Sequence, residues 1–134
     1  MAAFAVAEEG VNRHDTVILL ARGRGPAPVL FSRPAGKVVS AESYRLMTTA
    51  EGAASRGARQ YGFGLQIDSI AGRMAISHGG GIHGFITAST WVPSAELSVT
   101  VLTNSGSAKS GELMRQLARA ALGLPLEAPK ALVP

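Results

Sequence analysis

Residues 61–104 carry four short segments in which apolar and polar residues alternate, and connections of only a few residues separate them. A period of two predicts strands with one buried face. The predicted strands cover residues 61–68, 73–78, 85–92 and 97–104. In the first predicted strand the side chains that share one face are Tyr61, Phe63, Leu65 and Ile67. In the second they are Met74, Ile76 and His78. Short connections make neighbouring strands antiparallel, so the pattern predicts an antiparallel β-meander.

Two helices flank the predicted meander. Ser40 is a typical N-cap, and the helix that follows should stop near Gly52. A second helix is predicted from Ser110 to about Leu122, with Gly123 as its C-cap. Its apolar stripe consists of Leu113, Met114, Leu117 and Ala121. This helix should lie across the sheet, which gives an α+β fold: an antiparallel β-meander with a C-terminal helix packed on the sheet.

The chain divides by pattern into an N-terminal segment of uncertain structure, residues 1–38, and a C-terminal region, residues 39–134. Within the first, the apolar residues 16–21 and 29–31 are compatible with a hairpin. We also expect residues 16–21 to pair beside residues 97–104, because an open apolar edge of a sheet invites association. An edge left open would allow self-association of the chain.

Composition excludes several classes of function. The 134 residues suffice for one domain, and the net charge of +4 comes from scattered arginines without interleaved aromatic residues, which argues against nucleic acid as a partner. The chain has no cysteine, hence no disulfide or zinc–thiolate site. No apolar stretch approaches the roughly 20 residues of a membrane span. The first residues lack the basic start of an export signal, so a cytoplasmic chain is expected as written. No cofactor is expected.

The chemistry of the chain is concentrated where the second predicted strand ends, in the run Ser77-His78-Gly79-Gly80-Gly81-Ile82-His83-Gly84-Phe85. Consecutive glycines let a ligand approach the backbone and leave N–H groups free to stabilise an oxyanion. A plain glycine turn with His78 at the surface is equally compatible with the composition. A metal site is not expected, because no carboxylate lies near His78 and His83 in the sequence.

Two nucleotide- or lipase-type motifs also match this run formally. Gly79, Gly81 and Gly84 fit GxGxxG, but that fingerprint needs a following helix, and a strand is predicted there instead. The letters HGGG also spell the oxyanion loop of lipase-type hydrolases, which requires a GxSxG nucleophile elbow. The chain contains no GxSxG, which weighs against this reading.

Several motifs in one collinear order, over roughly residues 37–123, resemble a known family. They are Tyr61-Gly62-Phe63-Gly64-Leu65, then His78-Gly79-Gly80-Gly81-Ile82-His83-Gly84-Phe85, then Val99-Thr100-Val101-Leu102-Thr103-Asn104. The chain is similar to the C-terminal part of serine β-lactamase-like and penicillin-binding-protein-like hydrolases, with class C β-lactamases, esterases and D-aminopeptidases among them. The resemblance implies a partial β-lactamase/transpeptidase-like fold.

The resemblance also implies roles for individual residues. His78-Gly79-Gly80 stands where penicillin-recognising enzymes have Lys-Thr-Gly. By this likeness His78 orients groups near an active serine, and the backbone N–H of Gly81 belongs to the oxyanion hole. Gly79, Gly80 and His83 would line the substrate, a small ester or amide. Histidine in place of the lysine is typical of esterase- and peptidase-like members.

Two elements of the family are missing from this chain. No serine is followed three places later by lysine, and neither Tyr-x-Asn nor Ser-x-Asn occurs. Without an activated nucleophile no acyl-enzyme forms, so the chain should be inactive alone. It is therefore either the C-terminal portion of a hydrolase completed by another segment or chain, or a non-catalytic binding or assembly module derived from that fold. Members of the family are commonly exported.

Overall fold

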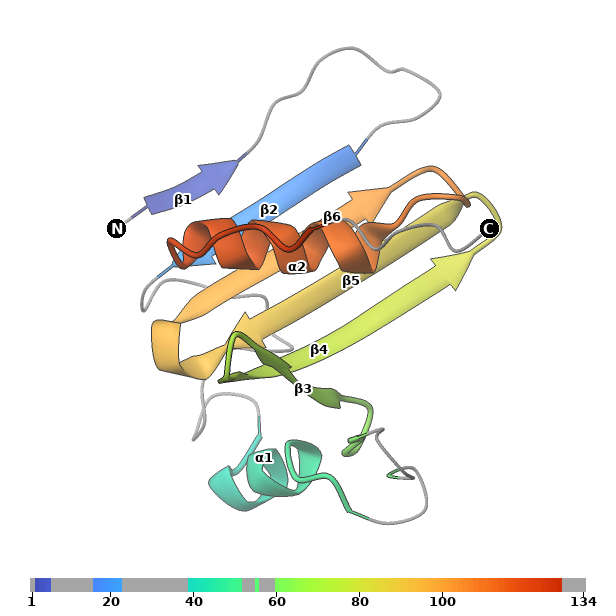
Figure 1. The fold of residues 1–134 in the computed structure, drawn as a ribbon. Coiled ribbons are helices and arrows are strands. Elements are labelled where there is room, and N and C mark those ends of the chain that lie inside the picture. The colour runs from blue at the N-terminus through green and yellow to red at the C-terminus, as the bar shows by residue number, and fades with distance from the viewer. Residues whose placement is uncertain (1, 6–15, 23–38, 52–54, 56–59, 129–134) are drawn as a thin grey trace.

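The computed structural model describes residues 2–5, 16–22, 39–51, 55 and 60–128. In this part of the chain six antiparallel strands form one sheet in the order β1-β2-β6-β5-β4-β3 (Figure 1). The strands are β1 (Ala2–Ala5), β2 (Thr16–Arg22), β3 (Gln66–Ile70), β4 (Arg73–Ile82), β5 (Phe85–Val92) and β6 (Leu97–Thr103). The helices are α1 (Ala41–Met47) and α2 (Ser110–Ala121), with a short 3-10 helix η1 (Pro93–Ala95) between β5 and β6. The predicted α+β class is confirmed.

Strands β3 to β6 are neighbours in chain order, which confirms the predicted meander. The bounds of β5 are those predicted, and β6 ends one residue earlier than expected. Ala71 and Gly72 form the predicted turn between β3 and β4. Local signals in this region, alternation and turn residues, therefore decide the topology.

Strand β2 lies beside β6, as the sequence predicts. Thr16 is opposite Thr103 and Leu20 is opposite Val99 in the antiparallel register. The other edge of β2 pairs with β1. Both edges of β2 are thus occupied. Residues 29–31, the other half of the expected hairpin, lie outside the described part of the chain.

Helix α2 covers one face of the sheet, lying over β6 and β5 (Figure 1). Met114 and Ala118 project from it into a cluster of buried residues. The sheet contributes Ile70, Ala75, Ala88, Val92, Leu97, Val99 and Val101 to this cluster. The hydroxyls of Thr103 and Ser110 both donate to the carbonyl oxygen of Ile86, at 2.8 and 3.2 Å, and so tie the start of α2 to β5. Each large apolar side chain buried here contributes roughly 1.5–3 kcal/mol.

The opposite face carries a smaller cluster beside β3. Leu65, Ile76 and Trp91 are buried in it, and Tyr44 and Met47 of α1 pack against them together with Ile67. Ile76 and Trp91 are cross-strand neighbours, so both project to the side away from α2. Trp91 is a core residue, as its alternation with Phe85 predicts. This second cluster fixes α1 next to the end of the sheet where β3 begins.

Helix α1 begins as predicted and ends early. The Ser40 hydroxyl accepts from the Ser43 N–H at 3.0 Å, which confirms the N-cap. The helix stops at Met47 rather than near Gly52, because the hydroxyls of Thr48 and Thr49 bind the carbonyls of Tyr44 and Arg45 at 2.9 and 2.6 Å. Such side-chain bonds compete with continuation of the helix. Neither described helix is long and apolar enough to cross a membrane.

Candidate functional site

The glycine run lies within strand β4, whereas the sequence predicts that the strand ends at His78. Residues 76–82 pair with β5 without interruption, from Ile76 opposite Trp91 to Ile82 opposite Phe85. Strand β3 pairs with β4 only as far as Ser77. Among the described residues, then, residues 78–82 pair on one side only. A complete ladder with β5 compensates for the weak strand preference of glycine.

The direction of the peptide groups in this segment follows from one side-chain bond. The hydroxyl of Thr87, a β5 residue, donates to the carbonyl oxygen of Gly80 at 3.4 Å, so this carbonyl faces β5. Backbone groups of successive residues in a strand point to opposite edges. The N–H and C=O groups of Gly79 and Gly81 therefore face the unpaired edge of β4.

Close packing against β5 explains part of the glycine content. A Cβ atom on Gly80 would lie 3.0 Å from the Thr87 hydroxyl, and one on Gly81 would lie 3.1 Å from Ile86 Cδ1. On Gly79 it would lie 3.4 Å from the Thr87 carbonyl oxygen, an ordinary contact. Glycine is thus favoured sterically at positions 80 and 81, and position 79 has room for a side chain.

Residues 61–65 form a tight turn next to this edge, and the prediction that β3 starts at Tyr61 is wrong. The Gly62 N–H donates to the Leu65 carbonyl at 2.8 Å, and Gly64 has φ +75°, a conformation that favours glycine. Phe63 is 71% exposed while Leu65 is buried, although simple alternation places them on one side. The two glycines convert an apparent strand into a turn.

The turn brings Tyr61 to His78. The Tyr61 hydroxyl lies 3.0 Å from His78 Nε2, while the ring centroids are 6.3 Å apart with planes tilted by 59°. The contact is thus a hydrogen bond rather than a stack. Sequence reasoning places Tyr61 in a family motif but assigns it no role. The signal that could have found it is the pair of glycines two residues apart, which breaks the strand after Tyr61.

His83 lies apart from His78. It occupies the two-residue turn with Gly84 between β4 and β5 and is exposed. Four strand residues, 79–82, lie between the two histidines, which places them roughly 16 Å apart. The structure thus brings His78, Gly79, Gly80 and Gly81 together along one edge and places His83 at the far end of the hairpin. Within the described residues, no three His, Asp or Glu side chains gather where they could hold a metal ion.

Exposed apolar side chains lie on the sheet face that α2 leaves open. Ile82 and Phe85 are direct cross-strand neighbours and are 75% and 52% exposed. Leu102 of β6, which is opposite Thr87, is 39% exposed. A patch of this kind next to the glycine edge is typical of a surface that another segment covers.

The phenol of Tyr44 has the clearest electrostatic shift near this face. Burial raises the pKa of the Tyr44 hydroxyl, and the neighbouring indole N–H of Trp91 partly offsets this rise. The buried Trp91 Nε1 has no partner of full hydrogen-bond geometry among the described residues. Tyr44 thus stays protonated to higher pH than a free tyrosine, and it packs against the cluster of Leu65, Ile76 and Trp91.

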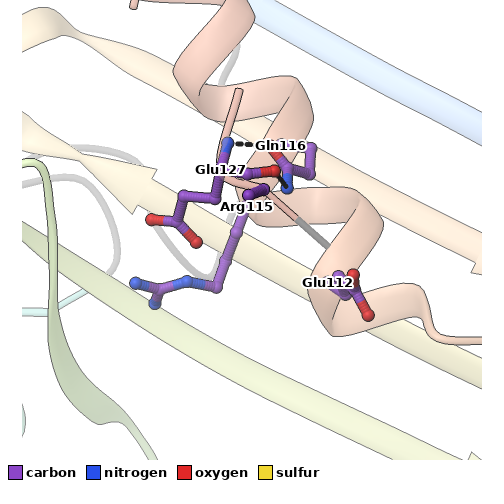
Figure 2. Close-up of a pocket in the computed structure, with 5 residues that line it drawn as sticks. Glu112, Arg115, Gln116 and Glu127 are labelled. Carbon is purple, nitrogen blue, oxygen red and sulfur yellow. Dashed lines mark hydrogen bonds between the residues drawn. The ribbon is translucent and has the colours of Figure 1, made fainter. Parts of the chain in front are cut away.

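A groove of about 460 Å³ lies on the other side of the molecule, between α2 and residues 127–128 (Figure 2). The side-chain amide of Gln116 binds the backbone of Glu127 twice, at 3.0 and 2.9 Å. Arg115 is bound to the Asp68 carboxylate and, at 3.1 Å, to the Ser69 carbonyl. These polar groups are engaged within the chain, and the groove lies on the α2 side of the sheet, whereas His78 projects from the other face. The groove is therefore the contact region between α2 and the residues that follow it, with its polar groups already hydrogen-bonded.

Comparison with known proteins places the fold. The chain matches the structure of the octameric penicillin-binding protein homologue from Pyrococcus abyssi, with a TM-score of 0.58 and 24% sequence identity over 65% of this chain. The match covers 20% of that protein, so this chain spans about a fifth of its length. No family model matches the chain, and no curated protein matches it significantly. The fold is therefore that of part of a penicillin-binding-protein-like domain.

Proposed function

We propose that this chain is the C-terminal portion of a serine hydrolase that acts on ester or amide bonds, with β-lactams and D-amino-acid peptides among the candidate substrates. His78 orients the reacting groups, and the Gly81 N–H donates to the oxyanion. Gly79 and Gly80 line the substrate. His83, at the far end of the hairpin, stays a predicted substrate contact.

One observation carries this proposal: in the described part of the chain, residues 78–82 of β4 pair with β5 alone, and the peptide groups of Gly79 and Gly81 face the other edge. A fixed backbone N–H is a preorganised donor for the charge that develops on a carbonyl oxygen, worth roughly 3 kcal/mol of barrier. The fold shared with a penicillin-binding protein homologue supports the assignment.

The nucleophile must come from another segment or chain, since Ser-x-x-Lys and Tyr-x-Asn do not occur here. We expect the isolated chain to be inert toward an activated ester, a chromogenic β-lactam and a serine-directed fluorophosphonate. Intact-mass spectrometry should show no adduct. Slow hydrolysis of an activated ester by His78 or His83 as general base would leave no acyl group behind. Stoichiometric labelling of one serine, abolished by a single Ser→Ala change, would contradict the proposal.

The positive test supplies a segment that carries the nucleophile. Co-expression with a segment that carries Ser-x-x-Lys and Tyr-x-Asn should restore turnover. In that hydrolase Gly81→Pro, which removes the proposed donor, should lower kcat by about 10²–10³-fold. Gly111→Ala serves as the control and should keep full activity, because Gly111 lies in α2 and a Cβ atom there meets nothing within 4 Å. Wild-type turnover with Gly81→Pro would overturn the role of this N–H.

A second candidate function is a non-catalytic binding or assembly module, and the absence of both catalytic motifs favours it. The Pyrococcus abyssi homologue is octameric. Self-association of this chain through an open sheet edge is the corresponding expectation, since β1 pairs only with β2 among the described strands. Cooperative unfolding of the isolated chain, together with a defined oligomer in sedimentation experiments, would favour this function over the hydrolase fragment.

A further inference from the structure

The hydrogen bond between Tyr61 and His78 joins the turn before β3 to strand β4. His78 lies on β4 and is exposed, and its side chain makes no other hydrogen bond to the described residues. Tyr61 lies in the turn before β3 and is partly buried. The orientation of the imidazole therefore depends on a side chain 17 residues earlier in the chain.

The backbone of Tyr61 is held firmly. The Ser55 hydroxyl accepts from the Tyr61 N–H at 3.1 Å and donates to the Tyr61 carbonyl at 2.7 Å. Tyr61 also forms a β-bridge with Gln66. Next to it, Gly62 lies so close to α1 that a Cβ atom would be 2.0 Å from the Met47 carbonyl oxygen. The phenol thus projects from a turn whose backbone is held by Ser55, by Gln66 and by close packing against α1.

The chemistry of the pair decides which atom carries the proton. A neutral imidazole has one N–H donor and one acceptor nitrogen, and the hydrogen bond made by one nitrogen sets the role of the other. A phenolic O–H is a stronger acid than the N–H of a neutral imidazole, which favours the phenol as the donor. In that arrangement Nε2 of His78 accepts and the ring proton resides on Nδ1.

We propose that Tyr61 is a positioning residue which holds His78 in the Nδ1–H tautomer, so that His78 offers a hydrogen-bond donor to an oxygen of the substrate. The contact between His78 and a substrate rests on the proposed function above, whereas the tautomer itself does not. The substrate feature it selects is an acceptor oxygen, such as an ester or amide carbonyl or a carboxylate. In the neutral state His78 then acts as a donor from Nδ1 and not as a base at that atom.

The test is the tautomeric state of His78, measured by long-range ¹H–¹⁵N correlation on the whole chain at about pH 8.5, well above the pKa of a free imidazole. His78→Gln assigns the signals, and the exposed His83 serves as the internal reference. The wild-type chain should show a protonated Nδ1 on His78. Tyr61→Phe should shift the population to the Nε2–H form that predominates in free imidazoles. A wild-type Nε2–H tautomer, or no change in Tyr61→Phe, would overturn the proposal.

Matched variants separate positioning from general loss of structure. Tyr44→Phe removes the other tyrosine hydroxyl of the chain and should leave the His78 signals unchanged. Ser55→Ala loosens the Tyr61 backbone without altering its ring and should give an intermediate tautomer ratio. Dispersed amide spectra show that each variant is folded.

The outcomes distinguish this inference from the proposed function. If the tautomer follows Tyr61 but no nucleophile-bearing segment yields a hydrolase, the proposed function fails and the tautomer assignment stands. In a hydrolase completed as above, Tyr61→Phe should lower kcat about tenfold with little change in KM. An unchanged kcat in a variant whose tautomer has shifted would overturn the positioning role.

Discussion

Replacing Gly62 by alanine should destabilise the chain far more than a surface glycine substitution does. The new Cβ atom would lie 2.0 Å from the Met47 carbonyl oxygen, 2.9 Å from the Met47 carbonyl carbon and 3.1 Å from the Thr49 carbonyl oxygen. Ordinary carbon–oxygen contacts are about 3.3–3.6 Å. All three neighbours are backbone atoms, so no side-chain rotation relieves the overlap, and the turn has to move away from α1 by about 1.3 Å.

The cost follows from what this movement disrupts. The Gly62–Leu65 hydrogen bond, 2.8 Å long, or the bridge between Tyr61 and Gln66 is strained, at roughly 0.5–1.5 kcal/mol each. Met47 moves away from its cluster with Leu65 and Trp91, and overpacking of this kind costs about 1–3 kcal/mol. We expect a total loss of about 2–4 kcal/mol in the free energy of unfolding.

Urea unfolding, followed by Trp91 fluorescence and by circular dichroism, measures this loss. Gly111→Ala is the matched control: it lies in α2, a Cβ atom there meets nothing within 4 Å, and helix propensity should raise stability by about 0.5 kcal/mol. The proposed packing of the turn on α1 is refuted if Gly62→Ala and the wild type differ by less than about 0.5 kcal/mol at equal m value.

Two further predictions concern the strand edge and the buried phenol. Gly80→Pro should cost about 3 kcal/mol or more, because its N–H faces β5, whereas Gly81→Pro removes an N–H that faces the open edge and should cost much less; equal losses in urea unfolding would contradict the assigned direction of the peptide groups. Because burial raises the pKa of Tyr44, the folded chain retains the phenolic proton more tightly than the unfolded chain. The contribution of the protonated Tyr44 hydroxyl to folding stability is therefore complete below about pH 10 and is lost as the pH rises through the folded pKa. Above about pH 10 the urea midpoint should fall less steeply in Tyr44→Phe than in the wild type.

Sequence reasoning succeeds here where a local pattern suffices. Strand β5 has its predicted bounds because eight residues alternate between two turn signals, and α2 starts at the predicted Ser110. The pairing of β2 with β6 was also predicted, from the need to protect an apolar edge. These elements follow from hydrophobic period and edge protection, which are properties of short segments.

The site is less predictable because its geometry depends on contacts between distant residues. The glycine run continues β4 only because β5 supplies a partner for each of its residues, and the alternation from Tyr61 to Leu65 fails because Gly62 packs against the end of α1. The bond between Tyr61 and His78 depends on both features, the continued strand β4 and the turn at residues 61–65. No pattern within either motif encodes it.

The two faces of the sheet differ in how deeply their apolar side chains are buried, and they should therefore contribute unequally to the free energy of unfolding. This difference tests whether another segment covers the exposed face. Leu97 is fully buried beneath α2, whereas Phe85 on the other face is 52% exposed next to the exposed Ile82. Leu97→Ala should therefore cost about 2–5 kcal/mol through lost contacts and a cavity. Phe85→Ser removes a side chain that solvent already reaches and should cost below about 1 kcal/mol.

The same substitution should alter association in the opposite sense. Water in contact with Ile82 and Phe85 is displaced when another surface covers them, so the isolated chain should self-associate and Phe85→Ser should shift it toward the monomer. Sedimentation velocity over a range of concentrations measures this shift, with Leu126→Ser, a 63% exposed residue after α2, as the matched control. If Phe85→Ser destabilises the chain as much as Leu97→Ala, the face is closed within this chain. It then needs no further segment to cover it.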